Sequence, residues 1–267
     1  PLESLAIIWA AQQYAMVATS NQDTPAGLET AFTAAERSLV AAAIVRRCDR
    51  LDGVADGMVH DTKACQSRFT LNRDVPTCLG ARDGTCLTAA QKAVISAIAK
   101  GARDSLGVPF YASFPFDPGI GGNGIPFWEF TAPLALNPGE TGTIFAVPPS
   151  TLPLTNSAAY ALGLDIDTAL ASLSATDATY TESALSFMNP PSPANLSNVR
   201  ARGGRVIVYH GVADTNYSVD DSIAWYRAVD EKSAGRASSF ARLYTIPGMG
   251  HCSGGPATDQ ADFITHR

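Results

Sequence analysis

Two stretches decide the fold of this chain: Tyr209-His210-Gly211-Val212-Ala213-Asp214 and, downstream of it, Ile246-Pro247-Gly248-Met249-Gly250-His251-Cys252. Each follows a short run rich in β-branched and aromatic residues, 205–209 or 241–245, and such runs are typical of buried strands. Each stretch then turns at a glycine and presents one group that can exchange a proton, an acid in the first and a base in the second. The sequence therefore predicts two strand ends that carry complementary chemistry.

Asp214 and His251 are the acid and the base that we expect to act together. Residues of about 219–230 fit a helix, and two strands joined through one helix are expected to be parallel neighbours. The loops at their C-terminal ends then open on the same edge of the sheet. An acid followed by a histidine is also the order in which an α/β-hydrolase carries its last two triad members. Taken singly, His251 fits a surface residue and Asp214 a helix cap; taken as a pair on adjacent strands, catalysis is the better interpretation.

The serine that such a pair would serve is missing from this sequence. No G-x-S-x-G elbow occurs in the 267 residues, and no serine follows a comparable strand-turn-helix pattern. The start at Pro1 shows no secretory peptide, so we expect that a leader was removed or that the chain begins within a longer protein.

Composition narrows the class of protein. A chain of 267 residues that is 46% hydrophobic suits one large domain or two small ones with a real core. A formal net charge of −6 with only 19 Lys and Arg argues against nucleic acid as a partner. No apolar run reaches the length of a membrane span, so no membrane partner is expected.

The cysteines indicate an exported protein, secreted or periplasmic. Their spacing contains no C-x-x-C, and the simplest pairing is Cys48 with Cys65 and Cys78 with Cys86, which leaves Cys252 over. Buried reduced thiols are the alternative for the first four. An odd cysteine in an exported chain suggests a partner outside the chain.

The segments between these landmarks differ in character. Helices are expected over 4–18, over 33–47 behind a capping box at Thr33, and over 88–100 behind a second one at Thr88. Residues 104–199 contain no Lys or Arg and are predicted to form long loops with short helices near 165–173 and 180–187, as in a lid or binding wall. The stretch 119–124 matches G-x-G-x-x-G without a strand before it or a helix after it, so we interpret it as a flexible loop.

An acidic loop at 49–58 is a candidate calcium site. Asp49, Asp52 and Asp56 are spaced three and four residues apart in a glycine-containing loop and can supply carboxylates, with carbonyl oxygens from Val54 and Met58. The loop is not an EF-hand, because its third position is a leucine and no glutamate closes it. The alternative is a loop closed by Asx turns.

Aromatic side chains are candidates for a substrate-binding wall. Phe127, Trp128, Phe130 and Tyr217 are the candidates, and His210 at the end of the first strand is a further candidate for substrate contact. For the first three, an ordinary core position is an equally good interpretation.

Several of these motifs together resemble the tannase and feruloyl esterase family. The resemblance rests on Cys48-Asp49 with the segment 51–57, on Cys65, on Cys78 with the segment 83–88, and on the segment 247–256. It implies an α/β-hydrolase core with a large inserted lid that holds a structural calcium ion. It also implies Asp214 as the acid, His251 as the base, and a disulfide from Cys252 to a cysteine that neighbours the catalytic serine.

The resemblance sets the expected domain order and function. Residues 1–28 would connect core to lid, 29–195 would form the lid, and 196–267 would form the C-terminal part of the α/β-hydrolase core. The N-terminal core strands and the Cys-Ser elbow are expected in a missing N-terminal part or a companion chain. The expected function is a serine carboxylesterase that hydrolyses small aromatic esters through an acyl-serine. The alternative is a non-catalytic, calcium-stabilised secreted binding module or pseudo-enzyme fragment.

Overall fold

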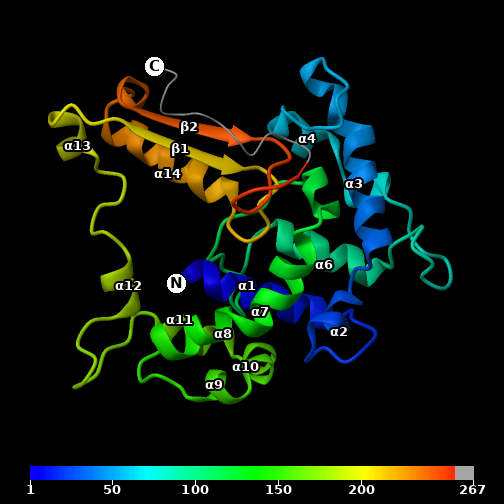
Figure 1. Ribbon diagram of the computed structural model, residues 1–267, viewed down its shortest axis with the longest axis horizontal. Coiled ribbons are helices and arrows are strands. Elements are labelled where there is room, and N and C mark those ends of the chain that lie inside the picture. The colour runs from blue at the N-terminus through cyan, green and yellow to red at the C-terminus, as the bar shows by residue number, and fades with distance from the viewer. Residues whose placement is uncertain (256–267) are drawn as a thin grey trace.

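The two predicted strands form a parallel sheet in the computed structural model, which describes residues 1–255. Strand β1 (Val206–Gly211) pairs with β2 (Ala241–Ile246) in a register that sets Val206 opposite Ala241 and Gly211 opposite Ile246. Helix α14 (Val219–Lys232) connects them and lies along one face of the sheet (Figure 1). The predicted strand–helix–strand unit is confirmed. The last part of the expected core, residues 256–267, lies outside the described residues.

Apart from η5 (Ala237–Ser239), the remaining elements precede the sheet in the chain. They are α1 (Leu2–Ala15), α2 (Pro25–Glu29), α3 (Ala34–Cys48), η1 (Asp49–Asp52), α4 (Thr62–Arg68), α5 (Leu71–Asp74), α6 (Ala89–Ala99), η2 (Pro118–Gly121), the π-helical turn η3 (Pro126–Thr131), α7 (Ala132–Ala135), α8 (Asn137–Gly139), the π-helical turn η4 (Glu140–Ile144), α9 (Leu152–Thr155), α10 (Ser157–Gly163), α11 (Ile166–Ser172), α12 (Ala184–Met188) and α13 (Ser197–Ala201), and a short turn η5 (Ala237–Ser239) stands before β2. None of the helices in residues 1–255 is long and apolar enough to cross a membrane.

The sheet is covered on one face only within the described residues. Side chains alternate along β1, so that Val206 packs with Val229 of α14 and with Phe240, whereas Ile207 and Tyr209 lie on the opposite face. Ile207 is 48% exposed, Tyr209 52% and Tyr244 of β2 46%. His210 lies on the covered face, so its ring is directed toward α14.

The helices pack around a separate and larger core. Ile8 of α1, Leu28, Ile44 of α3 and Phe130 are each at most 1% exposed and belong to one apolar cluster. Residues before and after position 28, where the connecting segment was expected to meet the lid, therefore share this core. Both predicted capping boxes are present, since Thr33 and Thr88 accept the N–H groups of the third helical residues, whose side chains bond back to the caps.

The segment 104–199 is more helical than the sequence analysis predicted. From Pro126 to Ile144 it runs through consecutive short helical turns, η3, α7, α8 and η4, where long loops were expected. Prolines near the start of several turns explain the error: each ends one helical segment and is tolerated in the first turn of the next, so the pattern resembles a loop. The predicted helix at 180–187 is confined to α12, which begins at Ala184.

The interpretation of 119–124 as a flexible loop was wrong for 119–121, whereas 122–124 form a bend and a turn. Residues 118–121 form η2 and pack against α3 and against the loop after β1. A Cβ atom added at Gly119 would lie 2.1 Å from the Cβ of Ala213, and one added at Gly121 would lie 3.0 Å from that of Ala41. These glycines are needed for close approach between segments rather than for freedom of the chain.

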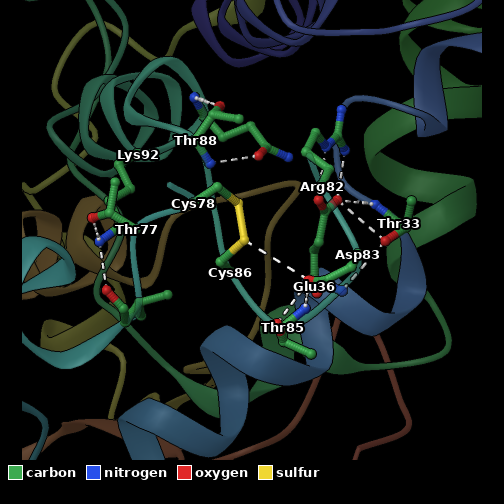
Figure 2. The surroundings of a disulfide bond; sticks show 12 residues. Thr33, Glu36, Thr77, Cys78, Arg82, Asp83, Thr85, Cys86, Thr88 and Lys92 are labelled. Atoms are coloured by element: carbon green, nitrogen blue, oxygen red, sulfur yellow. Dashed lines mark hydrogen bonds and ion pairs between the residues drawn. A yellow bond between two sulfur atoms is a disulfide. The ribbon is translucent and has the colours of Figure 1, made fainter. Parts of the chain in front are cut away.

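Both predicted disulfides are present, Cys48–Cys65 and Cys78–Cys86. The second closes a short loop that also carries Arg82 (Figure 2). Arg82 donates to both carboxylate oxygens of Glu36, at 2.8 and 2.6 Å, and to the carbonyl of Thr30 at 2.9 Å. Glu36 is 1% exposed and is the capping-box residue of α3. The disulfide loop therefore supplies the cation that neutralises a buried carboxylate.

Replacing Arg82 should destabilise the protein more than its surface position suggests. Burial raises the pKa of Glu36, but the hydrogen bonds from Arg82, the Thr33 N–H and Gln91 lower it on balance. Arg82→Ala leaves that carboxylate without its cation and should lower the free energy of unfolding by about 3 kcal/mol. Chemical denaturation measures the change. The exposed Arg50→Ala is the control and should change the free energy by less than about 0.5 kcal/mol; equal effects of the two changes would contradict this account.

Candidate active site

The loops after β1 and β2 are held together by their backbones. The N–H of Ala213 donates to the carbonyl of Met249 at 3.0 Å, and that of Val212 donates to Ile246 at 2.9 Å. A Cβ atom at Gly211 would lie 2.2 Å from the carbonyl oxygen of Met249, so only glycine permits this crossing. We call the segment 212–217 the acid loop and the segment 247–255 the histidine loop. Their docking fixes the distance between Asp214 and His251.

Asp214 and His251 form the predicted hydrogen-bonded pair. The Nδ1 atom of His251 lies 2.9 Å from Oδ2 of Asp214, inside the range of about 2.6–3.2 Å expected for a base and its orienting acid. The other oxygen, Oδ1, accepts the N–H groups of Asn216 and Tyr217, both at 2.9 Å. The predicted proximity is confirmed.

The surroundings of Asp214 keep it ionised. Its side chain is only 7% exposed, and burial by itself raises the pKa of a carboxyl. Hydrogen bonds from His210, from the Tyr217 N–H and from His251 outweigh burial and hold the pKa of Asp214 below its ordinary value. A charged Asp214 fixes the proton of His251 on Nδ1, which leaves Nε2 with a lone pair.

Two of the predicted aromatic side chains flank the His251 ring. Trp128 meets it edge to face, with ring centroids 4.2 Å apart, and Tyr217 meets it at 5.1 Å. Phe127 is 46% exposed and packs on Trp128 at 4.8 Å, so it extends the same wall outward. Phe130 is 1% exposed and packs on Tyr14, in agreement with the core interpretation.

His210 was predicted as a substrate contact, and the structure places it behind Asp214 instead. Its Nδ1 atom lies 2.7 Å from Oγ of Ser222, and its Nε2 atom lies 3.0 Å from the carbonyl oxygen of Tyr217. Both ring nitrogens are therefore engaged within the protein, and neither is left for a substrate.

A cleft of about 490 Å³ opens beside His251. The glycine-rich turn η2 and the residues after it form one wall, Trp128 and His251 contribute aromatic surface, and the histidine loop forms the rim. None of the described residues that line the cleft is a Lys, Arg, Asp or Glu. The segment 119–124, which sequence analysis set aside, thus borders the cleft. Its signal was the density of glycines, which close packing requires.

The carboxylates predicted as calcium ligands accept N–H groups of their own loop. Asp49 Oδ1 accepts the N–H groups of Asp56 and Gly57 at 3.0 and 2.8 Å, and Asp52 Oδ1 accepts that of Val54 at 2.8 Å. Asp56 likewise accepts the N–H of Met58 at 3.1 Å. No group of three or more His, Cys, Asp or Glu side chains in residues 1–255 is arranged to hold a metal. These hydrogen bonds match the alternative, a loop closed by Asx turns, and calcium binding by the loop stays a prediction.

Comparison with protein families matches residues 4–266 to the family described as tannase and feruloyl esterase. This chain belongs to that family. It is 32% identical over 262 residues to the mono(2-hydroxyethyl) terephthalate hydrolase of Piscinibacter sakaiensis. This alignment covers 89% of this chain and 43% of the relative. It is 29% identical over 245 residues to a probable feruloyl esterase B-1 of Aspergillus fumigatus, covering 86% of this chain and 40% of the relative.

Solved structures of esterases share the fold. The crystal structure of feruloyl esterase B from Aspergillus oryzae superimposes with a TM-score of 0.63 at 22% identity, over 94% of this chain and 46% of that one. Tannin acyl hydrolase from Aspergillus niger gives a TM-score of 0.62 at 20% identity, over 94% and 45%. The chain therefore spans less than half the length of these tannase-family proteins.

Two buried carboxyl groups near the pair were missed from the sequence. Glu129 lies next to Trp128 on η3, accepts the hydroxyl of Tyr14 at 2.7 Å and bonds the side chain of Thr215 in the acid loop. Burial raises the pKa of Glu129. One charge inside the apolar run 127–130 was the available signal. The other carboxyl, Asp117, precedes a Pro-Gly turn and gave no sign of burial.

Asp117 joins two segments of this tannase-family site, the turn η2 and the histidine loop. It is 5% exposed, and its Oδ1 accepts the N–H of Gly119 at 2.8 Å. Burial raises its pKa to about 6, although the N–H groups of Gly119 and of Gly248 in the histidine loop lower it. Oδ2 is buried without a hydrogen-bond partner among the described residues, and Asp117 lines a cavity of about 90 Å³.

Neutralising Asp117 should stabilise the protein above neutral pH. Its pKa is about 6 when folded and 3.8 ordinarily, so the folded state loses stability relative to the unfolded state as pH rises from 4 toward 7. Two pKa units correspond to about 3 kcal/mol, which is an upper limit for the effect. The free energy of unfolding of Asp117→Asn minus that of the wild type should therefore grow between pH 4 and pH 7, as denaturation experiments would measure. A flat difference for Asp117→Asn would refute the assignment.

Proposed function

We propose that this chain supplies the acid and the base of a serine carboxylesterase that hydrolyses aromatic esters. The observation that carries the proposal is the 2.9 Å contact between His251 Nδ1 and Asp214 Oδ2, at the edge of a cleft. Membership of the tannase and feruloyl esterase family supports it. The nucleophilic serine would lie in a part of the protein outside these 267 residues, since no G-x-S-x-G elbow is present in them.

The geometry suits His251 for proton transfer in both halves of the reaction. Its Nε2 atom would take the proton of the serine hydroxyl as the serine oxygen attacks the ester carbonyl. Asp214 would stabilise the resulting imidazolium. The same proton would then pass to the departing alkoxide, leaving an acyl-serine and a free alcohol. In the second half, His251 would take a proton from water as that water attacks the acyl-serine, and return it to the serine oxygen.

Neutral aromatic esters are the proposed substrate class. Trp128 offers an aromatic surface in the cleft beside the base, with Phe127 packed on it, and the cleft lining carries no charged side chain among the described residues. Lys100 and Arg103, the cations that flank the uncharged segment, do not line this cleft, and Arg103 bonds the carbonyl of Gly107. A carboxylate on the substrate would therefore have no partner from this chain.

The rest of the esterase core is proposed to pack on the outer face of the sheet. Ile207, Tyr209 and Tyr244 are about half exposed there, which suits a face that another layer covers. Cys252 is an exposed free cysteine, and we propose that it bonds a cysteine next to the serine. The two disulfides within the chain fit an oxidising compartment, and we propose export. Residues 29–195 would then act as the lid.

Calcium binding at the loop 49–58 stays a prediction of the sequence alone. The hydrogen bonds of Asp49, Asp52 and Asp56 to the loop backbone do not support it. A melting curve measured with calcium and with a chelator tests it, because the prediction requires a lower melting temperature with the chelator.

Removing either member of the pair should abolish most turnover of the full-length polypeptide. His251→Ala should lower kcat by roughly 10³–10⁶-fold because the serine loses its base. Asp214→Asn should lower it by roughly 10³–10⁴-fold because the imidazole loses its orienting charge. Steady-state kinetics on an aromatic ester measure both.

The control is Asp177→Asn, since Asp177 accepts two backbone N–H groups of a turn at 2.7 Å, as Asp214 does, without lining the cleft. It should leave kcat within about twofold of wild type. Near-normal turnover by His251→Ala would contradict the proposed mechanism. A full-length protein without any esterase activity would favour a binding module.

A neutral aromatic ester should be hydrolysed at least as well as an anionic one. We expect kcat/KM for an alkyl ferulate to equal or exceed that for mono(2-hydroxyethyl) terephthalate, because no cation of the cleft lining pairs with the terephthalate carboxylate. The comparison is made at two salt concentrations, since pairing with a cation would be salt-dependent. A strong, salt-sensitive preference for the anionic monoester would contradict the proposed substrate class.

A further inference from the structure

Two imidazole rings approach the same oxygen of Asp214. The Nδ1 atom of His251 lies 2.9 Å from Oδ2, and the Nε2 atom of His210 lies 3.5 Å from it. The first ring comes from the histidine loop. The second comes from the C-terminal end of strand β1, on the face that α14 covers. One carboxylate oxygen of Asp214 therefore contacts both rings, and only the ring of His251 takes part in the proposed reaction.

The hydrogen bonds of His210 determine its tautomer. Its Nε2 atom lies 3.0 Å from the Tyr217 carbonyl oxygen, which can only accept, so Nε2 carries the proton of the neutral ring. Nδ1 then accepts the hydroxyl of Ser222 at 2.7 Å. When the ring is charged, Nδ1 can donate to the same hydroxyl oxygen, because a serine both donates and accepts. His210 can therefore gain or lose a proton without losing a partner.

The charged groups acting on His210 are both acids. Asp214 lies on the acid loop, and Asp221 lies on α14 beside Ser222. Burial lowers the pKa of His210, but the hydrogen bonds to Asp214 and Tyr217 and the charges of Asp214 and Asp221 raise it on balance. Burial and the charge of Glu3 on α1 raise the pKa of Asp221, which the charge of His210 lowers. The charges of both carboxyl groups therefore favour the charged form of the ring.

We propose that His210 is a positioning residue that holds Asp214 in place and whose charge opposes protonation of His251. Two positively charged rings on one carboxylate repel each other, so their protonations are coupled. When His210 is charged, His251 stays deprotonated down to a lower pH. It therefore remains competent as a base at that pH. The consequence for catalysis rests on the proposed esterase function. The coupling itself does not, because it can be observed in this chain without any substrate.

Histidine titrations by NMR test the proposal on the full-length polypeptide, without substrate and with isotope-labelled imidazoles. In the wild type, neutral His210 should carry its proton on Nε2, which needs no variant to observe. In His210→Gln, which keeps an N–H donor but cannot be charged, the titration midpoint of His251 should rise by roughly one pH unit. Ser222→Ala removes the group that accepts from charged His210, so it should shift the same midpoint in the same direction by less.

The matched control is His60→Gln. His60 also pairs with an aspartate four residues away, Asp56, at 3.3 Å, but its side chain is 44% exposed and it lies on another loop. This variant should leave the His251 midpoint unchanged. Neutral His210 protonated on Nδ1, or a His251 midpoint unmoved in both His210→Gln and Ser222→Ala, would overturn the proposal. Either failure would leave the esterase proposal standing, since that depends on turnover by the full-length polypeptide.

Discussion

The contact between the acid loop and the histidine loop is the constraint on which the site depends. Asp214 and His251 are far apart in the sequence, and each stands on a loop that could take other conformations alone. The hydrogen bond from the Ala213 N–H to the Met249 carbonyl joins the loops. It is possible only because Gly211 lets the Met249 carbonyl approach the strand end. The distance between acid and base is therefore set by backbone packing rather than by the two side chains.

The short π-helical turn η3 supports this arrangement from the other side. Trp128 packs on the His251 ring, and the next residue, Glu129, bonds the acid loop through Thr215 and the helix α1 through Tyr14. One turn thus contacts both the base and the loop of the acid. It also connects them to the helical core, so a disturbance there would reach the pair. π-Helical turns are often found at functional sites, and here the extra residue per turn brings neighbouring side chains to different parts of one site.

The sequence predicted the parts of this fold that depend on local chemistry. The strand runs, the helix between them, the capping boxes at Thr33 and Thr88 and the short-range disulfides each have a signal within a few residues, and all are present. The Asp214–His251 pair was predictable because chain order and crossover geometry bring the two loops to one edge. Two failures depended on distant packing, since the place of Gly119 against Ala213 and the burial of Asp117 are set by segments far away in sequence. The others were local. Prolines concealed the short helical turns from Pro126 to Ile144, and His210 is positioned by partners 4 to 12 residues further along the chain.

A structure of the full-length polypeptide after reaction with an aryl phosphonate ester would test the central claim most directly. Such a probe labels a serine that has been activated as a nucleophile. The account predicts phosphorus on a single serine outside residues 1–267, with its Oγ within about 3.2 Å of His251 Nε2 while Nδ1 keeps its bond to Asp214. A labelled serine remote from His251, or no labelled serine in a folded protein, would contradict the account.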